Sequence, residues 1–166
     1  MKMSSPFIDE LTREAETTRR VLERVPQHKL DWKPHPKSMS LGQLALHVAQ
    51  TPGMVAQLIT ENECEVPPQF TQPEAKSGAE LLTALDQSVS GAKAKLEGWD
   101  DASLMAEWKL QRGPKTIMAL PRVGMIRSIM LNHWYHHRGQ LLVYLRLLDV
   151  PVPSVYGPSA DENPFA

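Results

Sequence analysis

Apolar residues recur every three to four positions along four long stretches of this chain, which is the spacing that predicts amphipathic helices. The first stretch runs from Pro6 to Val25 and ends at Pro26, because proline interrupts the hydrogen bonding of a helix. Ser40 and Gln43 form a capping-box pattern, which predicts the start of a second helix over residues 41–59. Charged residues separate the apolar positions of the first stretch, so this helix has an apolar face that a core must cover.

The second half of the chain predicts two more helices. Ser77 and Glu80 repeat the capping-box pattern before a third helix, which ends at about Trp99. Pro121 is well placed as the first residue of the last helix, because the first helical position needs no backbone N–H. That helix is long and extends over residues 122–148.

Three shorter segments lie within or between these helices. Thr51-Pro52-Gly53 falls inside the second helix, but the apolar pattern resumes in phase, which predicts a kink or a π-like irregularity. Residues 66–76 are rich in Pro and Gln and predict a loop. The flanks of Arg112-Gly113 predict a short hairpin before the last helix. We therefore expect an all-α four-helix bundle with this hairpin as an addition, in a single domain over residues 1–166. The unequal linkers leave the order of the helices open.

Composition and charge narrow the classes of function. The formal net charge is −1 and the pI is about 6.6, so the basic surface of a nucleic-acid-binding protein is not expected. Cys64 is the one cysteine, which excludes an internal disulfide and fits a reducing compartment. No stretch approaches the roughly 18 apolar residues of a membrane helix, and residues 1–9 lack the apolar core of a secretory signal. We expect a cytoplasmic protein that binds neither nucleic acid nor membrane.

Three histidines carry the candidate chemistry. His133 and His137 stand four positions apart, so they lie about 40° apart around a helix and one turn apart along it. The same geometry directs both toward the apolar side of the last helix. His47 is also directed inward, on the face of the second helix that carries Leu44 and Leu58. Three neutral imidazoles with a fourth position open are typical of a catalytic zinc-type site, although imidazole also suits nickel, iron and copper.

Each part of this pattern also has a structural explanation. With six histidines in the chain, a pair spaced by four positions arises by chance about one time in five. A single inward histidine is more often a hydrogen-bonded core residue than a ligand. Three buried imidazoles are harder to explain in this way, because each needs its own hydrogen-bond partners in an apolar core. A metal site and a helical scaffold with satisfied core histidines therefore both stay open at this point. His136 could replace His137 as a ligand, whereas His35 and His28 are expected at the surface.

Three segments of the chain are far more specific than the histidine spacing alone. They are DWKPHPKSMSLGQLALH at residues 31–47, LNHWYHHRGQLLVYLR at residues 131–146 and VPSVYGPSAD at residues 152–161. Together they resemble the DinB/YfiT-like superfamily of predicted metalloenzymes, over nearly the whole chain. The resemblance implies a four-helix bundle with a long crossover connection, and a homodimer. It also implies a metal-binding histidine triad, here His47, His133 and His137, with nickel or zinc as the metal.

The resemblance leaves the reaction open. Some relatives are thiol-dependent transferases that act with bacillithiol, mycothiol or glutathione, others resemble maleylpyruvate isomerases, and many have no known activity. The first hypothesis is therefore a metal-dependent enzyme, in particular a transferase that joins a low-molecular-weight thiol to a small-molecule substrate. Gln140 and Tyr144, on the histidine face, and Arg138, beside it in sequence, are candidates for orienting that substrate. The alternative is a non-catalytic metal-binding or stress-linked interaction protein.

Overall fold

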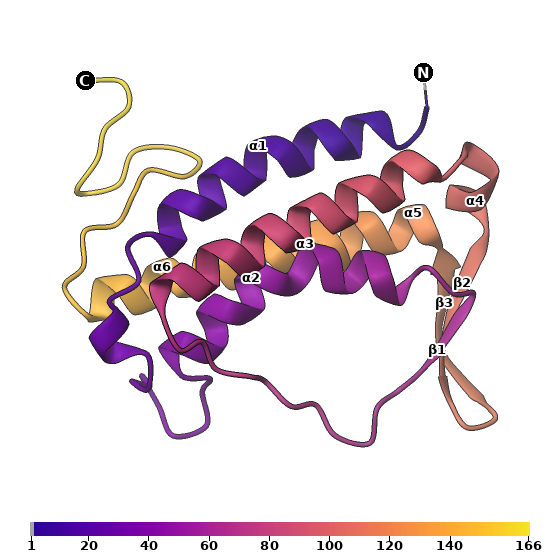
Figure 1. The fold of residues 1–166 in the computed structure, drawn as a ribbon, viewed down its shortest axis with the longest axis horizontal. Coiled ribbons are helices and arrows are strands. Elements are labelled where there is room, and N and C mark those ends of the chain that lie inside the picture. Colours follow the sequence, from indigo (N-terminus) through magenta and orange to yellow (C-terminus); the bar gives the residue numbers. More distant parts are fainter. Residues whose placement is uncertain (1) are drawn as a thin grey trace.

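The computed structural model describes residues 2–166, in which four long helices lie roughly along one axis (Figure 1). In chain order the elements are α1 (Ser5–Leu22), η1 (Gln27–Lys29), α2 (Leu41–Leu58), β1 (Glu63–Glu65), α3 (Gly78–Gly98), α4 (Asp101–Met105), β2 (Glu107–Arg112), β3 (Lys115–Pro121), α5 (Arg122–Met125), η2 (Ile126–Asn132) and α6 (His133–Leu147). The elements α5, η2 and α6 follow one another without a break and form the last helix of the bundle. Every helix of the described residues is too short or too polar to cross a bilayer.

The connection between α2 and α3 makes these two packed helices parallel. Helix α2 runs toward the end of the molecule that holds the strands, residues 66–77 return along its length, and α3 then runs in the same direction (Figure 1). Helix α1 and the last helix run the opposite way (Figure 1). This arrangement confirms the long crossover and gives the bundle an order that alternating short loops would not produce.

Serine caps begin α2 and α3, as the sequence predicts. The Ser40 hydroxyl accepts a hydrogen bond from the Gln43 backbone N–H at 3.1 Å, and the Gln43 side chain accepts one from the Ser40 N–H at 2.9 Å. The Ser77 hydroxyl accepts from the Glu80 N–H at 3.2 Å, but the Glu80 carboxylate accepts from the Lys76 N–H at 2.6 Å. The second capping box is therefore only half formed, because Glu80 reaches one residue further back.

A small sheet at one end of the bundle corrects the expected all-α class. Within residues 2–166 it has three strands in the order β1-β2-β3, and β2 and β3 form the predicted antiparallel hairpin. Gly113 lies in the turn of this hairpin with a φ of +54°, where a side chain would be strained. Strand β1 pairs in parallel with β2. The sequence did not predict β1, because three residues carry too little pattern to indicate a strand.

The last helix also departs from the expected single α-helix that begins at Pro121. Pro121 is the last residue of β3 and has an extended backbone, with φ −58° and ψ 149°, so helical geometry begins one residue later. Between α5 and α6 lies η2, a seven-residue π-helical segment. By contrast, α2 continues through Pro52, so the expectation that the helix does not end there is confirmed.

The core fills the space between the helices and is mainly aliphatic. Residues with an exposed fraction of 1% or less include Leu11, Val21, Leu44, Ile59, Leu81, Leu96, Trp108, Trp134 and Leu145. Helix α2 approaches α3 closely at Gly53, because a Cβ atom there would lie 2.8 Å from the Ser88 Cα and 2.9 Å from the Ser88 carbonyl oxygen. Only a residue without a side chain permits this approach.

We expect Gly53→Ala to destabilise the protein by about 1–3 kcal/mol, because the added methyl group meets the α3 backbone and the two helices must separate. Gly91→Ala on α3 is the matched control, since a Cβ at that position meets no atom of the described residues within 4 Å. There the higher helix propensity of alanine is expected to add up to about 1 kcal/mol. Urea unfolding followed by circular dichroism measures both changes. Equal effects of the two substitutions would contradict the close approach.

Candidate metal centre

Three imidazole rings converge between α2 and α6. His47 lies near the middle of α2, and His133 and His137 lie on the first two turns of α6. The Nε2 atoms of His47 and His133 are 3.3 Å apart, and one ring nitrogen from each of the three residues lies within 4.8 Å of the other two. The ring centroids of His47 and His137 are 4.6 Å apart, and those of His133 and His137 are 4.3 Å apart. Side chains that the sequence separates widely therefore meet as predicted.

This arrangement fits a divalent metal ion. Two nitrogens bound at about 2.0–2.1 Å to a tetrahedral ion stand about 3.3–3.4 Å apart, which matches the 3.3 Å between the Nε2 atoms of His47 and His133. The donor nitrogen of His137 lies within 4.8 Å of both of the others. Among the described residues, the grouping contains three donor side chains and no fourth. Such a set would leave a coordination position for a ligand from outside the protein.

The short separation also has an explanation without a metal. Two unprotonated nitrogens at 3.3 Å would repel each other through their lone pairs, and a proton on one of the rings of His47 and His133 would remove that repulsion. An N–H···N hydrogen bond would satisfy both rings. This is the contact expected if the protein is a helical scaffold whose core histidines bind no metal. Metal-binding measurements decide between these two explanations.

Pro52 lies inside α2, just over one turn beyond His47. Pro52 has no N–H to donate to the carbonyl oxygen of Val48, and the indole Nε1 of Trp134 donates to that oxygen instead, at 2.8 Å. The Thr51 hydroxyl donates to the His47 carbonyl oxygen at 2.6 Å. Side chains thus replace or supplement the helical hydrogen bonds around His47, which fixes the local backbone.

The π-helical segment η2 ends directly before His133. A π-helix has a wider turn than an α-helix, and such segments are frequent at functional sites. The expectation that both histidines face the apolar side of the last helix assumed α-helical geometry throughout, so its angles do not carry across η2. Ile126 and Met130 are nevertheless fully buried. The residues of η2 gave no sequence signal, because they are ordinary in a helix.

Gln140 contacts one of the three histidines directly. Its Oε1 lies 2.7 Å from Nδ1 of His137, so a proton on Nδ1 would be donated to the amide oxygen. The Nε2 atom of His137 would then keep its lone pair free for a metal. Both Gln140 and the neighbouring His136 are exposed, so the cluster has a solvent-facing side there.

Tyr144 lies away from the three imidazoles. Its hydroxyl donates to the Met39 carbonyl oxygen at 3.3 Å, and its ring packs edge-on against Trp32 with a centroid distance of 5.6 Å. These contacts connect α6 to the residues that precede α2. In this structure the Tyr144 hydroxyl supports the packing of the bundle.

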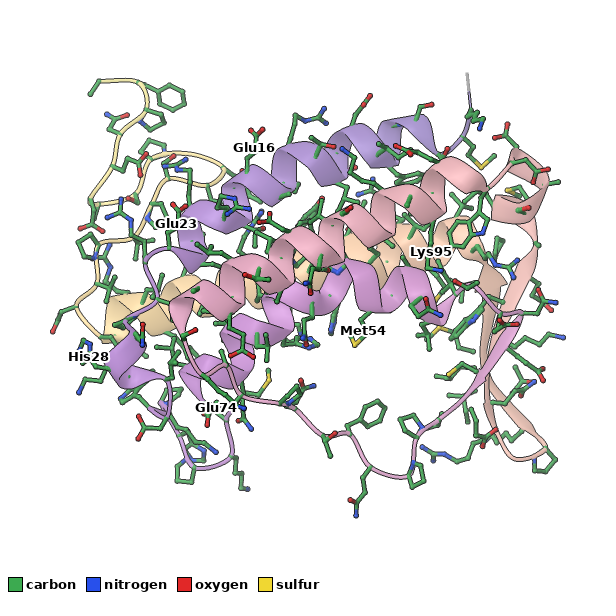
Figure 2. The ribbon with its side chains drawn as sticks, in the orientation of Figure 1. Glu16, Glu23, His28, Met54, Glu74 and Lys95 are labelled. Atoms are coloured by element: carbon green, nitrogen blue, oxygen red, sulfur yellow. The ribbon has the colours of Figure 1, made fainter. Side chains whose placement is uncertain are left out.

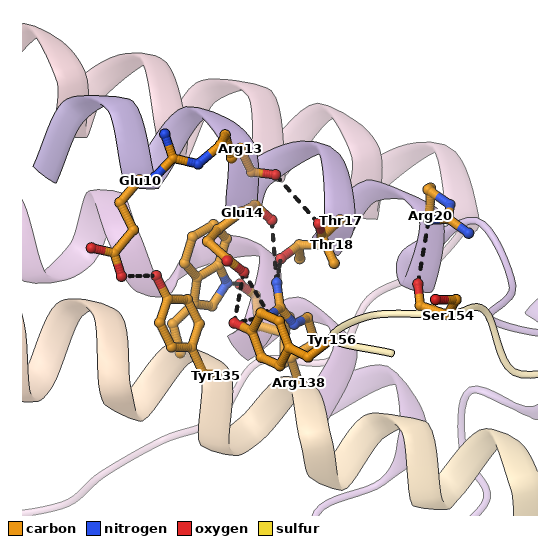
Figure 3. Close-up of polar contacts among 12 residues, drawn as sticks. Glu10, Arg13, Glu14, Thr17, Thr18, Arg20, Tyr135, Arg138, Ser154 and Tyr156 are labelled. Carbon is orange, nitrogen blue, oxygen red and sulfur yellow. Dashed lines mark hydrogen bonds and ion pairs between the residues drawn. The ribbon is translucent and has the colours of Figure 1, made fainter. Parts of the chain in front are cut away.

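Arg138 faces α1 and the C-terminal tail (Figure 3). Arg138 is 1% exposed, and its guanidinium lies 2.6 Å from the Glu14 carboxylate and donates to the Tyr156 hydroxyl at 2.6 Å. It also donates to the Thr18 hydroxyl at 3.1 Å and lies 5.2 Å from the centre of the Tyr135 ring. Arg138 therefore joins three parts of the chain, on the side of α6 that does not carry the histidine cluster.

The other histidines lie outside the three-nitrogen grouping. The ring of His136 is 5.0 Å from that of His137, centroid to centroid, and His136 is exposed. His35 is exposed, and its Nδ1 accepts a hydrogen bond from the Lys37 N–H at 3.1 Å. His28 lies at the surface, near the end of the molecule where α1 finishes (Figure 2).

The surroundings of the three imidazoles favour their neutral forms. Burial, followed by the neighbouring rings of His137 and His133, lowers the pKa of His47 from 6.5 to about 4. Burial and nearby histidines also lower the pKa of His133. Burial lowers the pKa of His137, against the opposing effect of Gln140. Neutral imidazole is the form that binds a metal, so the lowered pKa values favour metal binding by all three rings at neutral pH.

This shift predicts a pH dependence of the metal-free protein. Below pH 6.5 the unfolded chain protonates His47 while the folded chain does not until about pH 4, so the free energy of unfolding should fall as the pH falls. The loss is on the order of 1 kcal/mol per pH unit. Urea unfolding at several pH values, in the presence of a chelator, measures it. His47→Gln should flatten this slope, and an unchanged slope would contradict the lowered pKa.

Comparisons with known proteins agree with the fold and with the resemblance in sequence. The DinB family model matches residues 2–164 of this chain. The uncharacterized protein YrdA of Bacillus subtilis is 24% identical over 152 residues, which cover 90% of this chain and 85% of YrdA. A DinB-like protein from Bacillus cereus has a TM-score of 0.68 at 22% identity, covering 90% of this chain and 95% of its own. The DinB-like protein YjoA of Bacillus subtilis has a TM-score of 0.69 at 20% identity, covering 91% and 97%.

Proposed function

The chain belongs to the DinB family, and from this premise we propose that it is a metal-dependent enzyme, specifically a transferase that uses a low-molecular-weight thiol. His47, His133 and His137 would hold the metal, for which nickel and zinc are the first choices. All three are imidazole donors, which suit both ions. The substrate would be a small molecule that receives the thiol.

The observation that carries this proposal is the lack of compensating charge around the three histidines. Within residues 2–166, the pKa shifts of His47, His133 and His137 arise from burial, from histidines and from Gln140, with no Asp, Glu, Lys or Arg among their causes. Three neutral ligands would leave the +2 charge of a bound divalent ion uncompensated. A partly buried, uncompensated dication favours an anion in its open position.

A thiol is well suited to that position. A bound divalent ion would lower the pKa of a coordinated thiol and supply a thiolate nucleophile at neutral pH. The protein's own contribution is to keep the three imidazoles neutral and to fix His137 through Gln140. The exposed side beside His136 and Gln140 is where a thiol and its acceptor would approach. Gln140 is therefore the one orienting candidate that contacts a proposed ligand.

We expect the protein, purified without a histidine tag, to contain about one nickel or zinc ion per chain, measured by elemental analysis. His47→Ala, His133→Ala and His137→Ala should each weaken metal binding by more than about 100-fold, because even an indirect partner of a ligand is worth about 10–100-fold. His136→Ala is the matched control and should leave the affinity nearly unchanged. Metal content far below one per chain, without uptake on addition, would favour the helical scaffold.

We expect the cobalt(II)-substituted protein to develop a thiolate-to-cobalt absorption band when bacillithiol, mycothiol or glutathione is added. An alcohol of similar size is the control and should give no such band. The thiol that gives the band is then tested for turnover with a panel of electrophiles. The lack of a band with every thiol would contradict the thiol hypothesis. A band without turnover would favour the alternative, a non-catalytic metal-binding or stress-linked interaction protein.

A homodimer, a cytoplasmic location and a single domain over residues 1–166 stay predictions. The homodimer comes from the resemblance in sequence, and the location comes from composition. Sedimentation analysis of the metal-loaded protein measures the first directly. None of the three changes the role proposed for the histidines.

A further inference from the structure

The carbonyl oxygen of Val48 has lost its normal helical partner. In a regular α-helix the N–H of residue 52 would donate to it, but residue 52 is proline. A buried carbonyl without a donor costs about 1–3 kcal/mol. The indole N–H of Trp134 donates to this oxygen at 2.8 Å, and both Val48 and Trp134 are fully buried.

This hydrogen bond connects the two helices beside the candidate ligands. Val48 directly follows His47 on α2, and Trp134 directly follows His133 on α6. The indole bond and the 3.3 Å contact between the Nε2 atoms of His47 and His133 therefore join adjacent positions of the same two helices. A shift of one helix relative to the other at this level would alter both contacts, because the residues of each contact are neighbours along their chain segments.

Two other backbone groups beside Pro52 are satisfied by a different helix. The Ser88 hydroxyl on α3 accepts from the Gly53 N–H at 2.8 Å and donates to the Gln50 carbonyl oxygen at 3.0 Å. The segment of α2 around Pro52 is therefore held from two sides. Ser88 fixes it against α3, and Trp134 fixes it against the helix that carries two of the histidines.

We propose that Pro52 and Trp134 act as a positioning pair: the proline frees the Val48 carbonyl oxygen, and the indole that binds it sets the distance between His47 and His133. This inference rests on the proposed function, since its consequence is the affinity for the metal. Neither residue touches the metal position, so both act through the histidines. The distance between the two Nε2 atoms, and not the fold, is what the pair controls.

Trp134→Phe tests the pair, because phenylalanine keeps an aromatic ring in the core but has no N–H to donate. We expect zinc affinity, measured by competition with a chromophoric chelator, to fall about tenfold or more while helical content and cooperative unfolding persist. Trp108→Phe is the matched control. Trp108 is equally buried, at 1% exposed, but its Nε1 has no hydrogen-bond partner among residues 2–166. That control should change zinc affinity by less than about twofold.

Pro52→Ala makes the test independent of packing. It returns a backbone N–H to the Val48 carbonyl oxygen, so the indole is no longer the necessary donor. On the Pro52→Ala background, Trp134→Phe should cost less than about threefold in zinc affinity. A loss caused only by poorer packing would be the same on both backgrounds and would overturn the inference.

These measurements distinguish a failure of the proposed function from a failure of the inference about Pro52 and Trp134. If the unaltered protein binds no metal, the proposed function fails and the inference fails with it. If the unaltered protein binds zinc and Trp134→Phe binds it within about twofold, the inference alone is overturned. Reduced affinity that Pro52→Ala relieves supports the inference, whatever reaction the centre carries out.

Discussion

The packing of α2 against α6 is the contact on which the candidate metal centre depends, because it brings His47 to the two histidines of the last helix. A buried helix interface tolerates polar groups only when they have partners. At this interface the Val48 carbonyl oxygen has the Trp134 indole. The imidazoles have one another, Gln140 and, as we propose, a metal ion. The polar groups of the interface are therefore also the groups that define its chemistry.

Local sequence patterns predicted much of this fold. The capping box at Ser40, the apolar periodicity of the four helices and the hairpin around Gly113 depend on nearby residues, and all three are present. The meeting of His47 with His133 and His137 could also be predicted, since each points to the apolar side of its own helix. A bundle has only one such interior, so inward histidines on two helices have few places to go.

The features that were missed depend on distant parts of the chain. Strand β1 exists through its pairing with β2, and its own three residues carry no periodicity. The π-helical segment η2 consists of ordinary helix-forming residues, so its wider turn is set by what packs around it. Arg138 is beside His137 in sequence but lies on another face of α6, where Glu14 and the C-terminal tail surround it. Proximity in sequence was misleading there, whereas the helical angle was informative.

The separation of the histidines along the chain has a consequence for folding thermodynamics. His133 and His137 share one helical segment, but His47 lies 86 positions before His133. A partly unfolded chain that keeps only α6 helical could still offer two imidazoles, and it would bind the ion weakly. The ion would thus stabilise the native state by the difference between three-ligand and two-ligand affinity, and not by the full binding free energy. The single imidazole on α2 would set how much the metal raises the melting temperature.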